Sequence, residues 1–206
     1  MLEARPFRVE RATAAHDAAL EALFSTNGFG CYCRYWHFGG DHREWLARCA
    51  HAPDDNREEL RAALGASSSE ASGMVAFDAA DELVGWLKLA PASVMGKLYQ
   101  QRLYKGLPCF QRDQTGVWTV GCLFVREDRR RQGVASALLA GAIRSAAAAG
   151  ARSLEAFPRS DVDVADAALM MGPLALFVRA GFQVVHDFGP YPVLRLELGT
   201  ALTATP

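Results

Sequence analysis

The sequence predicts an α+β fold in which helices flank one mixed sheet, and three observations carry this prediction. The almost wholly apolar run from Val117 to Val125 is typical of a central strand that is buried on both faces. A helical stretch and then another strand follow it, which is the order of a right-handed crossover between parallel neighbours. Upstream, two β-like runs separated by a short polar segment predict an antiparallel hairpin. The sheet therefore combines parallel and antiparallel pairing.

The composition is that of an ordinary soluble globular chain. Its 206 residues are 50% hydrophobic and 22% charged, with a net charge of −1. These values exclude a disulfide-stapled miniprotein, a disordered chain and a basic nucleic-acid-binding protein. The N-terminal residues lack the apolar core of a signal peptide, and Arg144 interrupts the longest apolar tract, from Gly133 to Ala151. We therefore expect a cytoplasmic protein with neither a membrane nor a nucleic-acid partner.

The cysteines predict free thiols. Five of them, an odd number for a disulfide framework, are spread along the chain: Cys31, Cys33, Cys49, Cys109 and Cys122. A metal site is the alternative, because Cys31, Cys33, His37 and Cys49 could form a ligand set. However, Cys-x-Cys without a second close pair lacks the usual spacing of a zinc site. We expect no metal.

The first part of the chain is predicted to begin with a strand and continue with helices. Thr13 and Asp41 are residue types that cap helix N-termini, and Asn27-Gly28 is typical of a helix end. The predicted elements are a strand at Phe7 to Glu10, a helix from Thr13 to Asn27, a helix from Asp41 through Trp45 and Cys49, and a helix from Asn56 to Leu64.

The remainder of the chain is predicted to build the sheet. The expected elements are a hairpin of Met74 to Phe77 with Leu83 to Ala90, the strand at 117–125, a helix from Gly133 to Ala149, a strand from Ser153 to Phe157, a helix from Leu174 to Ala180, a strand from Phe182 to Val185 and an edge strand from Pro192 to Leu198. Residues 93–115 form a connection longer than a hairpin needs, which makes them a candidate lid. With no internal repeat and no linker, we expect a single domain over 1–206.

The turn between the strand at 117–125 and the next helix has the features of an anion site. Unsatisfied backbone N–H groups and the helix dipole favour a negative group at a helix N-terminus, and Gly133 allows a phosphate to approach closely. Ala135 keeps the first turn small. Only one glycine lies in the turn, which excludes a Walker A loop and a dinucleotide fingerprint. The alternative is a solvated arginine-rich turn that binds no ligand.

Arg130, Gly133 and Ala135 match the Arg/Gln-x-x-Gly-x-Gly/Ala motif, and the chain resembles the GNAT superfamily of acyl-CoA-dependent N-acyltransferases. The strand that ends at Leu123-Phe124-Val125 and the closing helix with Gly181-Phe182 agree with the order of elements in that superfamily. The CYCRYW stretch and the 93–115 insertion resemble a bacterial subgroup whose substrate is unknown. This resemblance implies that the parallel strand pair splays apart.

The resemblance also implies acetyl-CoA as the acyl donor. Its pyrophosphate would be held by Arg130 and by backbone N–H groups of Arg131, Gln132, Gly133, Val134, Ala135 and Ser136. Its pantetheine arm would pair like an extra strand with the strand at Leu123, Phe124 and Val125. Phe177, the last residue of this donor set, occupies the position where family members often carry a tyrosine acid. Because phenylalanine has no proton to give, the departing thiolate needs another donor or leaves unassisted.

Glu155 is our candidate general base. It lies in the middle of a predicted strand, on the face of Ser153 and Phe157, where an unpaired charge would be costly to bury. The alternative is a structural salt bridge to an arginine. His37 is the next candidate, and His186 and Asp161 are weaker ones.

The acceptor site is expected among Tyr35, Trp36, the 93–115 insertion and the loop after Phe157. Tyr35 and Trp36 could stack on a substrate or simply belong to the core, and Asp161, Asp163 and Asp166 could attract a cationic amine. The leading interpretation is direct acetyl transfer to a primary amine of a small molecule. The alternatives are a protein lysine or N-terminus as acceptor, or an acyl-CoA-binding module without transfer activity. The oligomeric state is left open, with a homodimer as one possibility.

Overall fold

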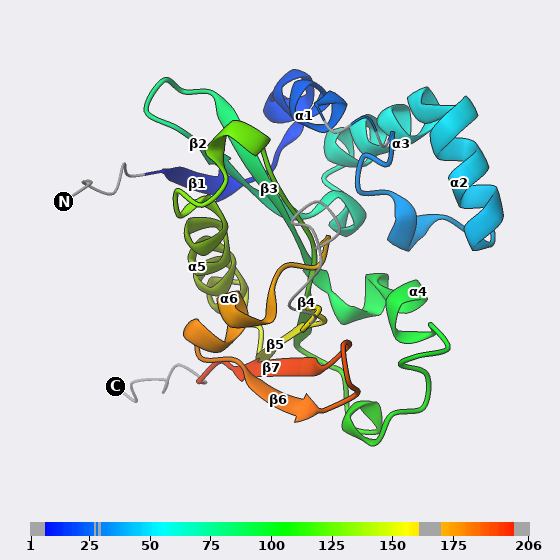
Figure 1. Ribbon diagram of the computed structural model, residues 1–206, viewed down its shortest axis with the longest axis vertical. Coiled ribbons are helices and arrows are strands. Elements are labelled where there is room, and N and C mark those ends of the chain that lie inside the picture. The colour runs from blue at the N-terminus through cyan, green and yellow to red at the C-terminus, as the bar shows by residue number, and fades with distance from the viewer. Residues whose placement is uncertain (1–6, 27, 29, 161–169, 200–206) are drawn as a thin grey trace.

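A computed structural model describes residues 7–26, 28, 30–160 and 170–199 of the chain. A seven-stranded sheet with the order β1-β2-β3-β4-β5-β7-β6 forms its centre (Figure 1). The strands are β1 (Arg8–Arg11), β2 (Gly73–Phe77), β3 (Leu83–Pro91), β4 (Val117–Val125), β5 (Ser153–Ala156), β6 (Gln183–His186) and β7 (Val193–Glu197). Strands β4 and β5 are parallel, and the other neighbouring strands pair antiparallel. The predicted mixed sheet is confirmed.

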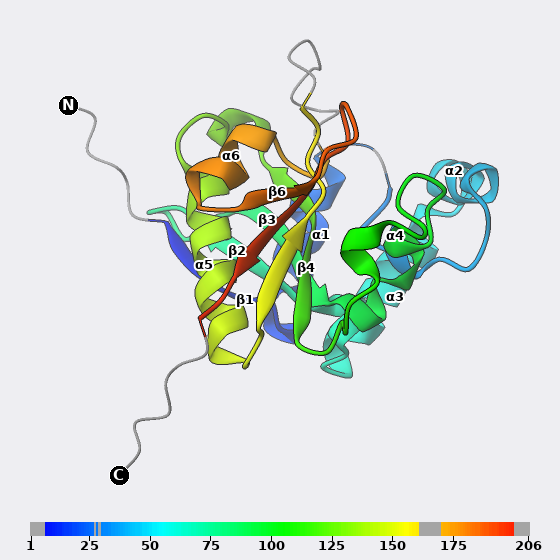
Figure 2. The same ribbon diagram turned by 90° about the horizontal axis from the view of Figure 1, so that it is seen from below.

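Helices cover both faces of the sheet. The α-helices are α1 (Asp17–Ser25), α2 (His42–His51), α3 (Pro53–Gly65), α4 (Gly96–Tyr99), α5 (Val134–Ala148) and α6 (Leu174–Arg179). Short 3₁₀ turns lie at Ala14–His16, Tyr35–His37, Ser69–Ala71, Ala92–Val94, Pro108–Phe110 and Glu127–Arg129. Figure 2 shows α5 and α6 on one face, with α1 to α4 on the other. The predicted cap at Asp41 is present, because its side chain accepts the Glu44 N–H at 2.8 Å.

The parallel pair opens part of the way along its length. Pairing between β4 and β5 runs from Val117↔Ser153 to Val120↔Ala156 and then stops. Strand β4 continues to Val125 while remaining paired with β3 on its other side. The C-terminal half of β4 therefore has one edge that β5 does not cover, as expected for a splayed pair.

Helix α5 packs closely on the sheet because its inner residues are small or apolar. Leu138, Leu139 and Ala142 are buried against the sheet, in one core cluster with residues of β2 and β3. At Gly141, an added Cβ would lie 2.5 Å from a Val9 methyl group. This fit fixes the start of α5 beside the end of β4.

The opposite face carries two clusters of buried side chains. Leu20, Leu23 and Trp86 belong to the first, under α1 and α3. The second contains Trp36, Tyr104 and Phe157 and is closed by the 93–115 segment. This segment, expected to be a long connection and a candidate lid, folds into short helical turns with Leu98 and Tyr104 buried. Trp86 and Leu89 of β3 are fully buried.

One prediction about the sheet was wrong. The last apolar run was expected to form an edge strand, but β7 lies between β5 and β6, and β6 is the edge. The burial pattern gives the reason, because Val193 and Leu194 are fully buried whereas Val184 of β6 is half exposed. The cysteines of the described residues are free thiols. No helix within the described ranges is long and apolar enough to cross a membrane.

Candidate functional site

A cavity of about 910 Å³ lies at the C-terminal end of β4. Its walls come from β4, from the turn into α5, from the first turn of α5 and from the segment that leads into α6. Thirteen of its lining residues belong to the stretch 123–136. Nine of these are members of the predicted donor set: Leu123, Phe124, Val125, Arg130, Arg131, Gly133, Val134, Ala135 and Ser136. The structure thus brings this predicted set together around one space.

Six consecutive backbone amides at this cavity have no hydrogen-bond partner. Within the described residues, the N–H groups of Arg131 through Ser136 donate to no acceptor, and the Ala137 N–H is the first to bond, to the Gly133 carbonyl at 3.0 Å. They stand at the N-terminus of a 15-residue helix, whose dipole places partial positive charge there. The arrangement is suited to an anion.

The backbone of this turn is shaped for such a ligand. Arg131 and Gly133 both adopt left-handed conformations, with φ of 58° and 93°. A Cβ added at Gly133 would meet no atom within 4 Å, so the missing side chain leaves open space above the amides. The residues present therefore fit a diphosphate.

The arginines around the cavity divide into paired and unpaired groups. Arg126 binds Asp128 and Glu82, and Arg129 binds Asp78 and Asp128. Arg130 donates from Nε to the Val125 carbonyl at 3.3 Å. Two lining arginines, Arg131 and Arg179, form no ion pair or hydrogen bond within the described part of the chain. The cavity is thus left with uncompensated positive charge.

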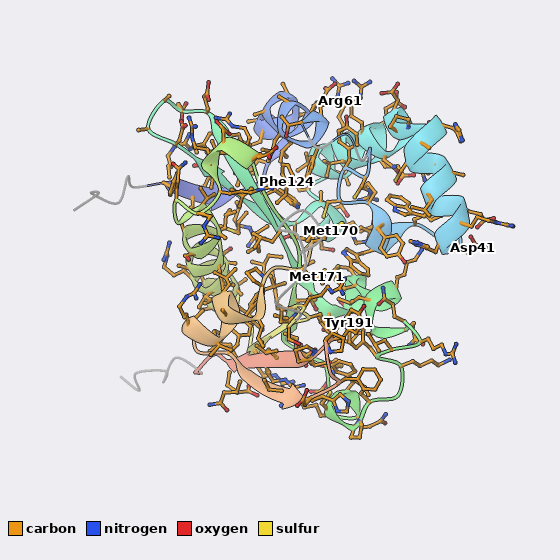
Figure 3. The ribbon with its side chains drawn as sticks, viewed as in Figure 1. Asp41, Arg61, Phe124, Met170, Met171 and Tyr191 are labelled. Atoms are coloured by element: carbon orange, nitrogen blue, oxygen red, sulfur yellow. The ribbon has the colours of Figure 1, made fainter. Side chains whose placement is uncertain are left out.

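The uncovered edge of β4 is contacted by the chain itself. The Leu123 N–H, which the sequence assigned to the pantetheine arm, donates to the Met170 carbonyl at 2.8 Å. We call residues 170–173 the strap. Figure 3 shows Met170 and Met171 beside the end of β4, near Phe124. Gly172 is buried at φ 82°, and a Cβ there would lie 3.0 Å from Phe177 and 3.2 Å from Leu123. The strap is therefore closely packed against the part of β4 with which the pantetheine arm is predicted to pair.

Two members of the predicted donor set do not line the cavity. The Gln132 side chain turns away and donates to the Asp128 carbonyl at 2.9 Å, so only the backbone of this residue joins the row of free amides. Phe177 is fully buried and packs edge-on against Phe182, with ring centroids 5.4 Å apart. It lies beneath the strap, which separates it from the cavity.

Glu155, the candidate base, is fully buried in an ion pair. Arg195 of β7 donates from Nε to Oε1 at 3.0 Å and also binds this oxygen through Nη2. The Tyr99 hydroxyl donates to Oε2 at 2.7 Å and contacts Thr119 Oγ1 at 2.7 Å. Burial and the charge of Glu155 raise the pKa of Tyr99 far above its ordinary value, so the tyrosine remains a donor. This is the salt bridge named as the alternative for Glu155.

Tyr35 and Trp36 contact the protein rather than the cavity. Trp36 is buried and directs its indole N–H at Cys122 Sγ, 3.2 Å away on β4. Tyr35 packs on Trp36 and Trp45, with Lys97 4.7 Å from its ring. The structure places both residues in the cluster that the 93–115 segment closes, and their role as substrate contacts stays a prediction.

The other titratable candidates are distributed over the molecule. Burial, helped by the charges of Lys88 and Arg34, lowers the pKa of His37 to about 4, so this ring is neutral. His186 stacks on Phe188 at the edge strand, with ring centroids 6.1 Å apart. Asp161, Asp163 and Asp166 lie outside the described residues. No group of three or more His, Cys, Asp or Glu side chains suited to a metal occurs among those described.

Comparison with models of known families identifies the family to which the chain belongs. The model of the acetyltransferase (GNAT) family matches residues 39–172, a range that holds β4, the free amides and α5. The chain belongs to the GNAT acetyltransferase family. GNAT members are acyltransferases, and acetyl-CoA is their acyl donor, which confirms the expected enzyme class and donor. No curated protein matches the sequence.

Solved structures share the fold at low sequence identity. PaiA N-acetyltransferase from Thermoplasma acidophilum, solved with coenzyme A, is 11% identical with a TM-score of 0.55, over 94% of this chain and 99% of that chain. A GCN5-related N-acetyltransferase from Kribbella flavida is 18% identical with a TM-score of 0.54, over 93% and 98%. These similarities establish the GNAT fold of the chain.

Sequence reasoning missed several residues of the cavity. Thr26, Met170, Pro173, Leu176 and Arg179 also line it, and they come from parts of the chain far from the 123–136 stretch. For Arg179 a signal was available, because this cation lies two residues before the closing Gly181-Phe182. For the others, only the folded chain shows the proximity.

Proposed function

We propose that this GNAT protein transfers the acetyl group of acetyl-CoA directly to the primary amine of a small molecule. The observation that carries the donor part is the row of six free amides at the start of α5. The acceptor part is supported by the aromatic covering of the face opposite α5, where Trp36, Tyr104 and Phe157 form a closed cluster. Because these side chains and the 93–115 segment fill this face, it offers less room to an extended polypeptide than to a small amine.

The donor's phosphates would be held by the chain's backbone. The amides of Arg131 to Ser136 lie at a helix N-terminus that borders the cavity, where an anion would gain from both hydrogen bonds and the helix dipole. The Arg130 guanidinium, fixed by the Val125 carbonyl, adds a charge at the same wall. Together these groups orient the donor with its acyl end toward β4.

The edge of β4 would then provide the polarising group. When bound, acetyl-CoA supplies an activated thioester carbonyl. Leu123 carries a backbone N–H on the edge of β4 that β5 leaves uncovered, and this N–H is bonded to the Met170 carbonyl. Once the strap releases it, this donor would stabilise negative charge that develops on an acyl oxygen. The amine nitrogen attacks the carbonyl carbon, the carbon–sulfur bond breaks, and the thiolate leaves unassisted and takes up a proton from solvent.

The attacking amine must also lose a proton, and Glu155 remains our proposed acceptor for it. Arg195 occupies Oε1, so the carboxylate would have to act through Tyr99, whose hydroxyl is bonded to Oε2. Tyr99 also contacts Thr119 on β4, one residue before the position where β4 and β5 separate. This contact connects the buried carboxylate to the point where the splayed edge begins.

A panel of acceptors tests the proposal. The purified protein is incubated with acetyl-CoA and with small primary amines, lysine peptides and peptides with free N-termini, while thiol release and the mass of each product are followed. We expect saturable acetylation of at least one small amine and none of the peptides. Acetylation of peptides alone would contradict the acceptor class, and tight CoA binding without thiol release from any mixture would contradict transfer itself.

A further inference from the structure

We propose that Arg179 of α6, assisted by Arg131, binds the 3′-phosphate of the donor's adenosine and thereby selects coenzyme A over 3′-dephospho-coenzyme A. Arg179 lines the cavity from the wall formed by α6, whereas Arg131 lines it from the turn before α5. The two residues are 48 positions apart in the chain, and only the fold brings them to one space.

The other cationic groups of the cavity are already committed. Arg126 and Arg129 are neutralised by carboxylates of their own turn and of the β2–β3 hairpin. Arg130 is anchored on the Val125 carbonyl, beside the row of free amides. Arg131 and Arg179 are exposed and have no partner among the described residues. They are therefore the guanidinium groups still available to an anion.

The donor carries a second anionic group, the 3′-phosphate, which the row of free amides does not bind. The helix N-terminus suits a diphosphate, while the 3′-phosphate is a separate monoester with a charge of about −1.5 to −2 near neutral pH. A guanidinium binds such a group with two parallel hydrogen bonds, which a lysine cannot reproduce. Two free arginines at one cavity thus match the charge that remains.

Arg179 has a structural alternative, because it lies in the last turn of α6, where a cation also stabilises the helix dipole. That role would affect folding and would not depend on which phosphates a ligand carries. The experiment must therefore compare two ligands that differ only in the 3′-phosphate.

The test compares the affinities of two ligands for the wild type and its variants, measured by calorimetry on the full chain. Coenzyme A and 3′-dephospho-coenzyme A are each titrated into the wild type, Arg179→Gln and Arg144→Gln. Arg144 is an exposed arginine of α5 that does not line the cavity, so its variant controls for the lost charge. We expect Arg179→Gln to weaken coenzyme A roughly 10-fold while changing 3′-dephospho-coenzyme A less than about twofold. Arg179→Lys should recover only part of the loss.

Three results would overturn the proposal. Equal weakening of both ligands by Arg179→Gln would assign the residue to the pyrophosphate, and unchanged affinity for both would remove it from the site. An equal effect of Arg144→Gln would show a general loss of charge. Thermal unfolding without ligand verifies that each variant is folded. The measurement does not involve an acceptor, so its outcome is independent of the acceptor class proposed above.

Discussion

Arg131 adopts a backbone conformation that residues other than glycine rarely adopt. Its φ of 58° lies in the left-handed region, which costs a side-chain-bearing residue roughly 1–2 kcal/mol. Such outliers persist where the surrounding structure requires them, and here the residue begins the row of free amides. The local cost thus lies at the row of free amides, where binding of an anion by these N–H groups, as we propose, would offset it.

Glu155→Gln tests the role of the buried ion pair. Because Arg195 is 8% exposed and would lose its charged partner, we expect the variant to lose roughly 3–5 kcal/mol of stability. If the Glu155 carboxylate also accepts the proton of the attacking amine, turnover should fall by a larger factor than the affinity for coenzyme A. Denaturant unfolding, calorimetry and initial rates measure the three quantities.

The matched control for this variant is Glu197→Gln on β7. Its carboxylate makes an exposed ion pair with Arg112 at 3.3 Å, so stability and turnover should change little. Equal turnover of Glu155→Gln and the wild type at every pH at which both are folded would remove Glu155 from catalysis.

His37 predicts a pH dependence of stability. Burial, with the charges of Lys88 and Arg34 and against that of Glu70, lowers its pKa to about 4 in the folded protein. An unfolded histidine titrates near 6.5, so between pH 6.5 and 4 the unfolded chain binds more protons. The unfolding free energy should therefore fall as pH drops through this window, by roughly 1–2 kcal/mol because the ring is partly solvated.

Denaturant unfolding of the wild type and of His37→Asn between pH 4 and 7 measures this dependence. The variant should lack the part of the slope that His37 contributes, while the carboxylates contribute equally to both proteins. Identical slopes would show that the pKa of His37 is the same in the folded and the unfolded chain.

At the scale of elements, the strap limits access to β4. Its Met170 carbonyl accepts the Leu123 N–H, while Met171 packs against the cluster that contains Trp36, Tyr104 and Phe157. If the pantetheine arm pairs with Leu123, this hydrogen bond must break. We therefore expect large shifts of the Leu123 and Gly172 amide resonances when coenzyme A is added to labelled protein.

The Thr119 amide provides the internal reference for this measurement, because its residue lies where β4 and β5 remain paired. Its resonance should shift little at saturating coenzyme A. If Leu123 and Gly172 also remain unshifted, the donor's arm does not use this edge of β4.

The elements of the donor site were largely predictable from sequence, because the information is local. An apolar run fixed β4, and Gly133 followed by small residues indicated the start of α5, which begins at Val134. The salt bridge of Glu155 was predictable only as a possibility. Its partner Arg195 faces it across the β5–β7 register, and that register depends on β7 lying inside the sheet.

At the scale of the molecule, the order of the strands could not be predicted from local sequence patterns. The runs that became β6 and β7 are both apolar, yet β7 is covered by two neighbours while β6 exposes Val184 at the edge. Which run takes the interior position in the sheet depends on contacts with distant strands. The same holds for Arg179 and the strap, which reach the cavity only because α6 returns beside the start of α5 (Figure 2).

The central claim is that the amides before and within the first turn of α5 hold the donor's pyrophosphate. It is tested most directly by calorimetric titration of coenzyme A into Gly133→Glu and Gly150→Glu. Both glycines are left-handed with open space at Cβ, but Gly133 precedes α5 at the cavity and Gly150 follows the helix. The account predicts that Gly133→Glu folds and loses coenzyme A binding, while Gly150→Glu binds like the wild type. Unchanged affinity of a folded Gly133→Glu would contradict it.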